Sequence, residues 1–296
     1  MLPDMKALTL ALVALLSVFA ASCSETVAGP GTLKFTAIPD HNSTELREKF
    51  EPLAAHLGEV LGVTVEYVPT ASYPASVEAF KNGDVMLAWF GGLTGVQARE
   101  AVEGSRAIAQ GKADPTFKSY FIVNSDTGIE RSDEFPAALA GKSFTFGSES
   151  STSGRLMPEY YIRENTGQSP EEFFGSPNNF SGGHDKTAVL VQAGTFDAGA
   201  LNYKTYDSMV AEGKLDPERC RIVWVTPDYA DYNWTAHPDL DTTFGAGFTD
   251  RLAAALVAIE DPELLAAVDR AEGLIPASNE DFDSIRKLAI ELKFLR

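Results

Sequence analysis

The chain has 296 residues, and its 42 acidic side chains against 24 Lys and Arg give a formal net charge of −18 at pH 7. A surface this acidic argues against binding to nucleic acid or to anionic membranes, because like charges repel. Beyond Cys23 the chain has one cysteine, Cys220, so neither a disulfide framework nor a cysteine-based metal site is predicted.

The N-terminus has the pattern of an export signal over residues 1–22. Lys6 precedes an apolar run of 15 residues, 7–21, which is short for a membrane span and typical of a signal core. Cys23 follows small residues, as in bacterial lipoprotein signals, although Ala20 stands where such signals usually have Leu. Both lipidation of Cys23 and cleavage without lipidation therefore remain open. Residues 23–31 are small and polar and predict a tether to the folded body.

The first part of the folded body alternates strands and helices. Apolar periodicity predicts strands at 32–38, 63–68 and 85–90 and helices at 43–61, 73–81 and 96–103. This β-α-β-α-β-α order implies a parallel sheet with helices on both faces.

The second part repeats this organisation. A strand at 118–123 is expected to leave the first unit. Helices are predicted at 155–164, 185–193 and 203–212, with strands at 197–201 and 221–226, a return strand at 232–236, and terminal helices at 250–259, 262–271 and 281–292. The predicted fold is α/β with two lobes, each a mainly parallel sheet flanked by helices. Lobe one comprises 32–124 and 233–296, and lobe two comprises 125–232.

A turn rich in hydroxyl groups is the most informative motif. It follows the strand Phe144-Thr-Phe146 and carries five hydroxyl side chains in the six positions 148–153, and Gly154 then leads into a helix. The first N–H groups of a helix lack intrahelical partners and the helix dipole is positive there, so such a turn favours an anion. N-capping alone would need only one of these hydroxyls. Pro158 fits best at the first helical position, which predicts an irregular turn before it.

Two glycine motifs also precede predicted helices. Gly91-Gly-Leu-Thr-Gly95 follows a buried strand but matches neither the dinucleotide fingerprint nor the phosphate loop. A tight turn is the alternative interpretation, although ligands bind at this end of parallel sheets. Ser181-Gly-Gly-His184-Asp185 would place His184 near the hydroxyl turn, or Asp185 would simply cap a helix. If His184 binds as a cation, affinity should fall as pH rises.

Aromatic residues are first candidates for the core, but some lie where a cleft wall is expected. Tyr73, before Pro74 at a helix start, is the best candidate to present its hydroxyl to a cleft, and Tyr232 falls at the return crossing. Signals for catalysis are weak, because there is no GxSxG elbow, no HExxH and no metal spacing among the four His residues. A nucleophilic serine in the hydroxyl turn would have only His184 as a base.

Five segments carry a resemblance to a known family. They are Phe35-Thr-Ala-Ile-Pro-Asp40, Ala88-Trp-Phe-Gly-Gly92, the stretch 146–154, Gly182-Gly-His-Asp185 and Gly199-Ala-Leu-Asn202. Together they resemble the phosphate/phosphite/phosphonate-binding proteins of ABC importers, and most closely a selenate-binding subgroup. The resemblance extends over nearly the whole mature chain and implies a two-lobed type II periplasmic-binding fold that closes on its ligand.

The resemblance also implies roles for particular residues. It assigns the oxyanion to the serine-rich turn and His184, between aromatic walls that include Tyr73. Aminophosphonate binders of this family usually have a carboxylate directly after the Asn of Gly-Ala-Leu-Asn, where this chain has Tyr203. The nearest carboxylates to these contacts are Asp185 and Asp231, and Asp185 would cap its helix. A site of donors alone then favours selenate or dianionic phosphite over aminoethylphosphonate. The predicted ligand-binding residues are Tyr73, Trp89, Phe90, Gly91, Ser150, Ser151, Thr152, Ser153, His184, Asp185, Asn202, Tyr203 and Tyr232.

The sequence thus predicts an extracytoplasmic solute-binding protein of an ABC importer for a small tetrahedral oxyanion. It is expected to be a monomer without catalytic, metal or cofactor-binding residues, and to deliver its ligand to a permease in the inner membrane. Its location would be the periplasmic or cell-surface side of the cytoplasmic membrane, with Cys23 as lipid anchor. The alternatives are a serine hydrolase that uses the 148–153 turn with His184, and an oxyanion sensor domain.

Overall fold

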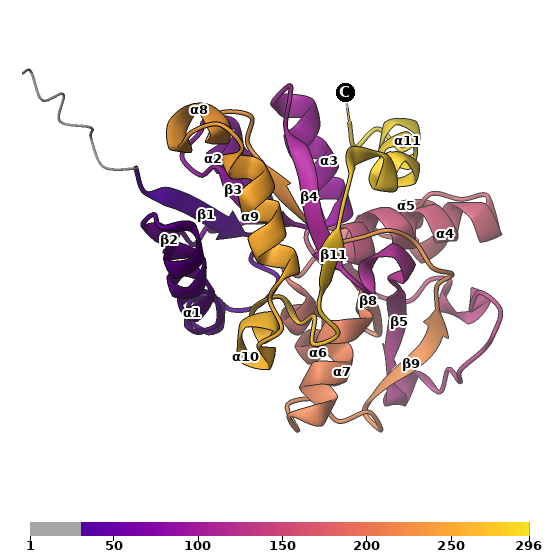
Figure 1. Cartoon of the computed structure of the whole chain (residues 1–296). Helices are drawn as coiled ribbons and strands as arrows, with labels where there is room; N and C mark the ends of the chain where they lie inside the picture. Colours follow the sequence, from indigo (N-terminus) through magenta and orange to yellow (C-terminus); the bar gives the residue numbers. More distant parts are fainter. Residues whose placement is uncertain (1–30, 296) are drawn as a thin grey trace, which may run out of the picture.

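Two β-sheets with helices packed around them form the protein in the computed structural model, which describes residues 31–295 (Figure 1). The predicted signal peptide, Cys23 and nearly all of the tether lie outside these residues. The strands are β1 (Leu33–Ala37), β2 (Val65–Tyr67), β3 (Leu87–Phe90), β4 (Arg106–Gly111), β5 (Ser119–Asn124), β6 (Phe144–Phe146), β7 (Asn179–Phe180), β8 (Ala198–Asn202), β9 (Cys220–Val225), β10 (Asn233–Ala236) and β11 (Leu274–Pro276). None of the helices within residues 31–295 has the length and apolar character needed to span a bilayer.

Each sheet is mainly parallel, as the sequence predicts. The six-stranded sheet has the order β11-β4-β10-β3-β1-β2, and only β10 and β11 run against the other strands. The five-stranded sheet has the order β7-β6-β8-β5-β9, and only β5 runs against the others. Strand β5, predicted to be part of lobe one, pairs along both of its edges with β8 and β9, so it belongs to the second sheet.

All predicted helices are present in the predicted order, but the short helices Pro170–Phe174 and Leu240–Phe244 and the strands β4, β7 and β11 were not predicted. They are α1 (Ser43–Leu61), α2 (Tyr73–Lys81), α3 (Gly92–Ala101), α4 (Met157–Thr166), α5 (Pro170–Phe174), α6 (His184–Gln192), α7 (Tyr203–Ala211), α8 (Leu240–Phe244), α9 (Phe248–Val257), α10 (Pro262–Leu265) and α11 (Asp283–Glu291). The predicted helix 262–271 is wrong in length, because Asp269 adopts a left-handed backbone with φ 52° and helical structure ends before it. Helix α3 begins at Gly92 rather than at 96, since the glycine motif is helical.

The hydroxyl turn leads into an unusual helix start. Residues Thr152–Leu156 form a π-helix, with Ser151 as the N-cap, and α4 continues directly from it with Pro158 in its first turn. The irregular turn predicted before Pro158 is therefore confirmed. A π-helical turn widens the helix and is common at functional sites.

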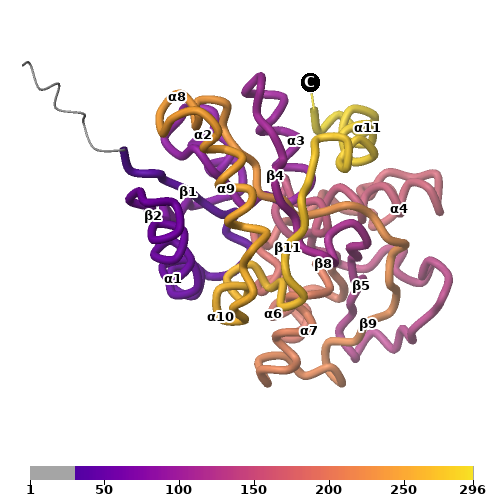
Figure 2. Tube along the Cα trace, in the orientation of Figure 1, coloured from indigo at the N-terminus to yellow at the C-terminus, as the bar shows by residue number. Residues whose placement is uncertain are grey.

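The chain crosses between the sheets after β4 and again after β9 (Figure 2). The two crossing segments pair with each other through Phe117 and Tyr229, whose N–H groups donate to each other's carbonyls at 2.9 and 3.0 Å. Asp114 in the first crossing accepts from the N–H of Asp231 in the second at 3.1 Å. The side chain of Asp114 forms a buried ion pair with Arg270, at 2.6 Å. These contacts fix the second crossing, and with it Asp231, against the six-stranded sheet.

Candidate functional site

Four helices begin at the seam between the two sheets. The starts of α2 and α3 come from the side of the six-stranded sheet, and the π-helix before α4 and the start of α6 come from the other side. The N–H of Leu93 in α3 donates to Thr152 Oγ1 at 2.9 Å, which joins the two sides directly. Because the first N–H groups of each helix and its dipole favour negative charge, this convergence supports an anion site.

Three buried polar atoms at this point have no hydrogen-bond partner among the described residues. They are Tyr73 Oη, His184 Nε2 and Asp231 Oδ2, on side chains that are 1%, 0% and 1% exposed. The Tyr73 hydroxyl lies near that of Ser151 and the Asp231 carboxylate near that of Thr152, but neither approach satisfies Tyr73 Oη or Asp231 Oδ2. A Cβ added to Gly154 would lie 3.1 Å from His184. Buried polar groups nearly always have partners. Three unpartnered groups in one place indicate that a bound ligand supplies their hydrogen-bond partners.

His184 is a neutral donor in this arrangement. Its Nδ1 accepts the N–H of Asn202 at 3.3 Å, which places the ring proton on the unpartnered Nε2. Burial, together with the charge of His41, lowers the pKa of His184 to about 3. The fall in affinity with pH expected from a cationic His184 is therefore not predicted by the structure.

Asp231 brings a carboxylate into the cluster, so the expectation of a site made of donors alone is wrong. Its Oδ1 accepts the N–H of Gly92 at 2.7 Å, and its Oδ2 has no partner. Burial raises the pKa of Asp231 to about 7, against the opposing effect of the Gly92 N–H. The sequence indicated Asp231 as one of the two nearest carboxylates, but Asp231 was not predicted to be a ligand-binding residue.

The hydroxyl turn contributes its middle residues to the cluster. Ser151 Oγ accepts the N–H of Gly154 at 3.0 Å and keeps its own proton for donation. Thr152 Oγ1, which accepts the N–H of Leu93, lies between the two sides, 3.2 Å from where a Cβ added to Gly91 would be. Ser153 is buried, and its carbonyl accepts the hydroxyl of Ser119 at 2.7 Å. Ser150 is only half-buried and lies at the outer part of the turn.

The remaining predicted residues divide into those next to the cluster and those away from it. Trp89 stacks on Tyr232, with ring centroids 5.5 Å apart, and the Tyr232 hydroxyl bonds to Asn202 at 3.0 Å. Phe90 packs edge-on against a core ring, Phe80, at 5.8 Å.

Asp185 and Tyr203 point elsewhere. Asp185 Oδ1 accepts the N–H of Lys186 at 2.7 Å, and the side chain lines a separate groove of about 300 Å³ with His41 and Glu212. Tyr203 packs against Phe117, with ring centroids 4.9 Å apart, so its ring is held among other aromatic rings.

Gly91 offers a first test of this seam. A Cβ added there would lie 3.2 Å from both Asp231 Oδ1 and Thr152 Oγ1, which is tight and would separate the two sides. We expect Gly91→Ala to lower ligand affinity by about tenfold, the loss of roughly one hydrogen bond to a charged group. Calorimetric titration measures this. Gly31→Ala, where the added Cβ would come no closer than 4.0 Å to a neighbour, is the control and should bind normally.

Comparison with known proteins identifies the family. Residues 35–282 match the family described as ABC transporter, phosphonate, periplasmic substrate-binding protein. The chain belongs to this family. It is 36% identical over 284 residues to the probable ABC transporter phosphite-binding protein PhnD1 of Prochlorococcus marinus, covering 94% of this chain and 95% of the relative. It is 28% identical over 279 residues to the phosphate-import protein PhnD of Mycolicibacterium smegmatis, covering 87% of this chain and 84% of the relative.

Solved structures of phosphonate-family proteins share the fold. The structure of P. marinus PhnD1 in complex with methylphosphonate has a TM-score of 0.85 and covers 90% of this chain and 100% of that one, at 36% identity. A binding component of a Pseudomonas aeruginosa phosphonate transporter has a TM-score of 0.76 at 18% identity, which shows the fold alone, and covers 88% of this chain and 85% of that one. The predicted periplasmic-binding fold and the role in ABC import are confirmed, while the resemblance to a selenate-binding subgroup remains a prediction.

Proposed function

We propose that this protein binds a small phosphorus oxyanion that carries one proton, with methylphosphonate and phosphite as the first candidates. The observation that carries this proposal is the set of unpartnered atoms at the seam, in which Tyr73 Oη and His184 Nε2 can donate and Asp231 Oδ2 can accept. An oxyanion with both acceptor oxygens and one hydroxyl matches this set. The P. marinus relative is named as a phosphite-binding protein, and its structure was solved in complex with methylphosphonate. Both agree with this proposal.

The proton distinguishes this ligand class from its competitors. Selenate and sulfate carry no proton at neutral pH, so they can only accept hydrogen bonds and would meet repulsion from an ionised Asp231. A monoanionic phosphonate or phosphite donates its own proton to that carboxylate. Aminoethylphosphonate would need a further carboxylate for its amine. Near Tyr73, over residues 31–295, Asp231 Oδ2 is the one carboxylate oxygen that is fully buried and without a partner.

The same geometry supports binding without turnover. A serine hydrolase needs a base with a free lone pair facing the nucleophile. Here Nδ1 of His184 accepts from the Asn202 N–H, so the nitrogen that faces the cluster carries a proton and cannot accept one from Ser151. We therefore infer a binding protein rather than an enzyme.

We also propose the placement of the two lobes and of the chain in the cell. One lobe holds the six-stranded sheet and the other the five-stranded sheet, with residues 112–118 and 226–232 as the crossings, so the first boundary moves before β5. Cys23 is proposed as the lipid anchor, with a monomeric body outside the cytoplasmic membrane. Mass spectrometry of the mature N-terminus from native membranes tests this, since an unmodified residue other than Cys23 would contradict it.

A thermal-shift screen tests the ligand class. A ligand that binds only the folded protein raises the melting temperature by mass action. We expect phosphite and methylphosphonate to give the largest shifts, and phosphate, sulfate, selenate and aminoethylphosphonate smaller ones. A larger shift with selenate than with both candidates would overturn the proposal.

A further inference from the structure

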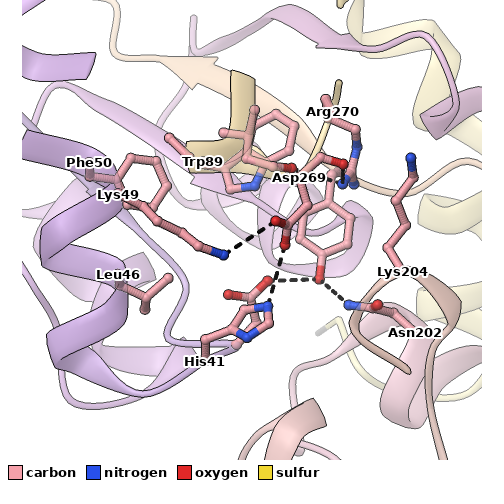
Figure 3. A pocket seen from close by; sticks show the side chains of 13 residues that line it. His41, Leu46, Lys49, Phe50, Trp89, Asn202, Lys204, Asp269 and Arg270 are labelled. Carbon is pink, nitrogen blue, oxygen red and sulfur yellow. Dashed lines mark hydrogen bonds and ion pairs between the residues drawn. The ribbon is translucent and has the colours of Figure 1, made fainter. Parts of the chain in front are cut away.

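Asn202 forms three hydrogen bonds at the boundary between the two sheets, through its backbone N–H and both ends of its side-chain amide. The residue ends β8 and is 3% exposed. Its backbone N–H donates to His184 Nδ1 at 3.3 Å, its Oδ1 accepts the N–H of Thr205 at 2.6 Å as the N-cap of α7, and its Nδ2 donates to Tyr232 Oη at 3.0 Å. The two bonds of the side-chain amide fix its orientation, with Oδ1 toward α7 and Nδ2 toward the Tyr232 hydroxyl (Figure 3).

These bonds belong to a closed ring that crosses the seam twice. Tyr232 Oη accepts from Asn202 and donates to Asp40 Oδ2 at 3.1 Å. The backbone carbonyl of Asp40 accepts the N–H of His184 at 3.3 Å, and Asn202 returns the ring to His184. His184 and Asn202 come from the side of the five-stranded sheet, and Asp40 and Tyr232 from the other side. The bonds between the sides can exist only while the two sides are together.

The half of the ring on the six-stranded side is rigid. Tyr232 stacks on Trp89, and the guanidinium of Arg270 lies 4.8 Å from its ring centroid, fixed in turn by Asp114. The nearby Lys204–Glu272 ion pair also joins the two sides, at 2.7 Å, but half of the Glu272 side chain is exposed. Exposed pairs contribute little, so the buried ring is the stronger link.

We propose that Asn202 is a positioning residue that couples the orientation of His184 to the contact between the two lobes, and that it thereby sets the lifetime of the ligand complex. This inference rests on the proposed function. When the lobes meet, the Asn202 amide bonds to Tyr232 while its backbone holds His184 with Nε2 toward the ligand. Separation of the lobes breaks the Asn202–Tyr232 bond and the His184–Asp40 bond together. Asn202 need not touch the ligand for this role.

Asn202→Ser tests the coupling, because serine keeps an N-cap acceptor for α7 but cannot reach Tyr232. Asn42→Ser is the matched control, since Asn42 caps α1 in the same way, accepting the N–H of Glu45 at 3.0 Å. Release of methylphosphonate and of phosphite is followed by tryptophan fluorescence in stopped flow. Loss of one buried hydrogen bond should speed release about threefold to tenfold in Asn202→Ser. The association rate of Asn202→Ser should not change, and the release rate of the control Asn42→Ser should not change.

A second variant keeps the test decisive if Asn202→Ser does not fold. Tyr232→Phe removes the same bond from the other side and should speed release at least as much. The double variant should release no faster than Tyr232→Phe alone, because the bond is already lost. Equal release rates for Asn202→Ser, Tyr232→Phe and the unaltered protein overturn the inference and leave the proposed function standing. Failure of the unaltered protein to bind either ligand overturns both.

Discussion

Asp231→Asn is expected to reverse the ligand preference of this protein. The amide cannot carry the negative charge that accepts the ligand proton, so methylphosphonate affinity should fall about tenfold to a hundredfold. Selenate affinity should rise, because the buried carboxylate that repels a dianion is gone. Calorimetric titration of both anions at pH 7 measures the change. Asp228→Asn, at an exposed position of the same crossing, is the control and should leave both affinities unchanged.

The affinity for selenate is expected to depend on pH through the charge of Asp231. Burial raises the pKa of Asp231 to about 7, so the carboxyl is neutral below that pH and charged above it. A proton-free dianion needs the neutral form, and its affinity should therefore fall about tenfold for each pH unit above 7. In Asp231→Asn the affinity for selenate should not depend on pH over this range. A selenate affinity that is equally flat in the unaltered protein would contradict the assignment.

Asp231 should also cost the ligand-free protein stability at high pH. Because its pKa in the folded protein lies above the unfolded value of 3.8, the stability it contributes is complete below that value and is lost as pH rises through about 7. The melting temperature of Asp231→Asn relative to the unaltered protein should therefore increase from pH 4 to pH 7 and then level off.

Tyr73→Phe is expected to stabilise the empty protein and weaken binding at the same time. The Tyr73 hydroxyl is buried without a partner, and its removal should raise the free energy of unfolding by about 1 kcal/mol. The ligand loses a donor to a charged oxygen, which should lower affinity about tenfold or more. Denaturant unfolding and calorimetry measure the two effects.

Tyr232→Phe is the matched control for the gain in stability and the loss of affinity expected in Tyr73→Phe. Its hydroxyl is equally buried but bonds to both Asn202 and Asp40, so its loss should destabilise the empty protein. If Tyr73→Phe destabilised the empty protein as much as Tyr232→Phe does, the Tyr73 hydroxyl would have a protein partner and would not be part of the ligand site.

Local signals in the sequence predicted much of the fold. Helix α2 begins at Tyr73, before Pro74, as predicted, and the structure shows that Ser72 caps it. The prediction failed at Gly92 and Gly95, where two glycines indicated a loop. The structure shows that a Cβ at Gly95 would lie 2.7 Å from Asn233, so the glycine serves close packing of α3 on β10. That reason depends on a residue far away in the chain.

The candidate site was predictable where one segment carries the chemistry, and not where distant segments combine. The hydroxyl turn and His184 can each be predicted from the composition of a short segment. Asp231 lies far from Thr152 in the sequence, and only the pairing of the two crossings brings it to Gly92. Asp185 looked equally suitable, yet the direction of α6 turns it to a neighbouring groove. Side-chain direction at a helix start was beyond what the sequence could decide.

Calorimetric titration with methylphosphonate and selenate at pH 7, in two buffers of different ionisation enthalpy, tests the central claim most directly. The method reports the affinity and the number of protons exchanged on binding. We predict that methylphosphonate binds more tightly than selenate. We also predict that more protons are taken up from the buffer when selenate binds, because selenate carries no proton and Asp231 must be protonated to accept it. Tighter binding of selenate, with no proton uptake, would contradict the account.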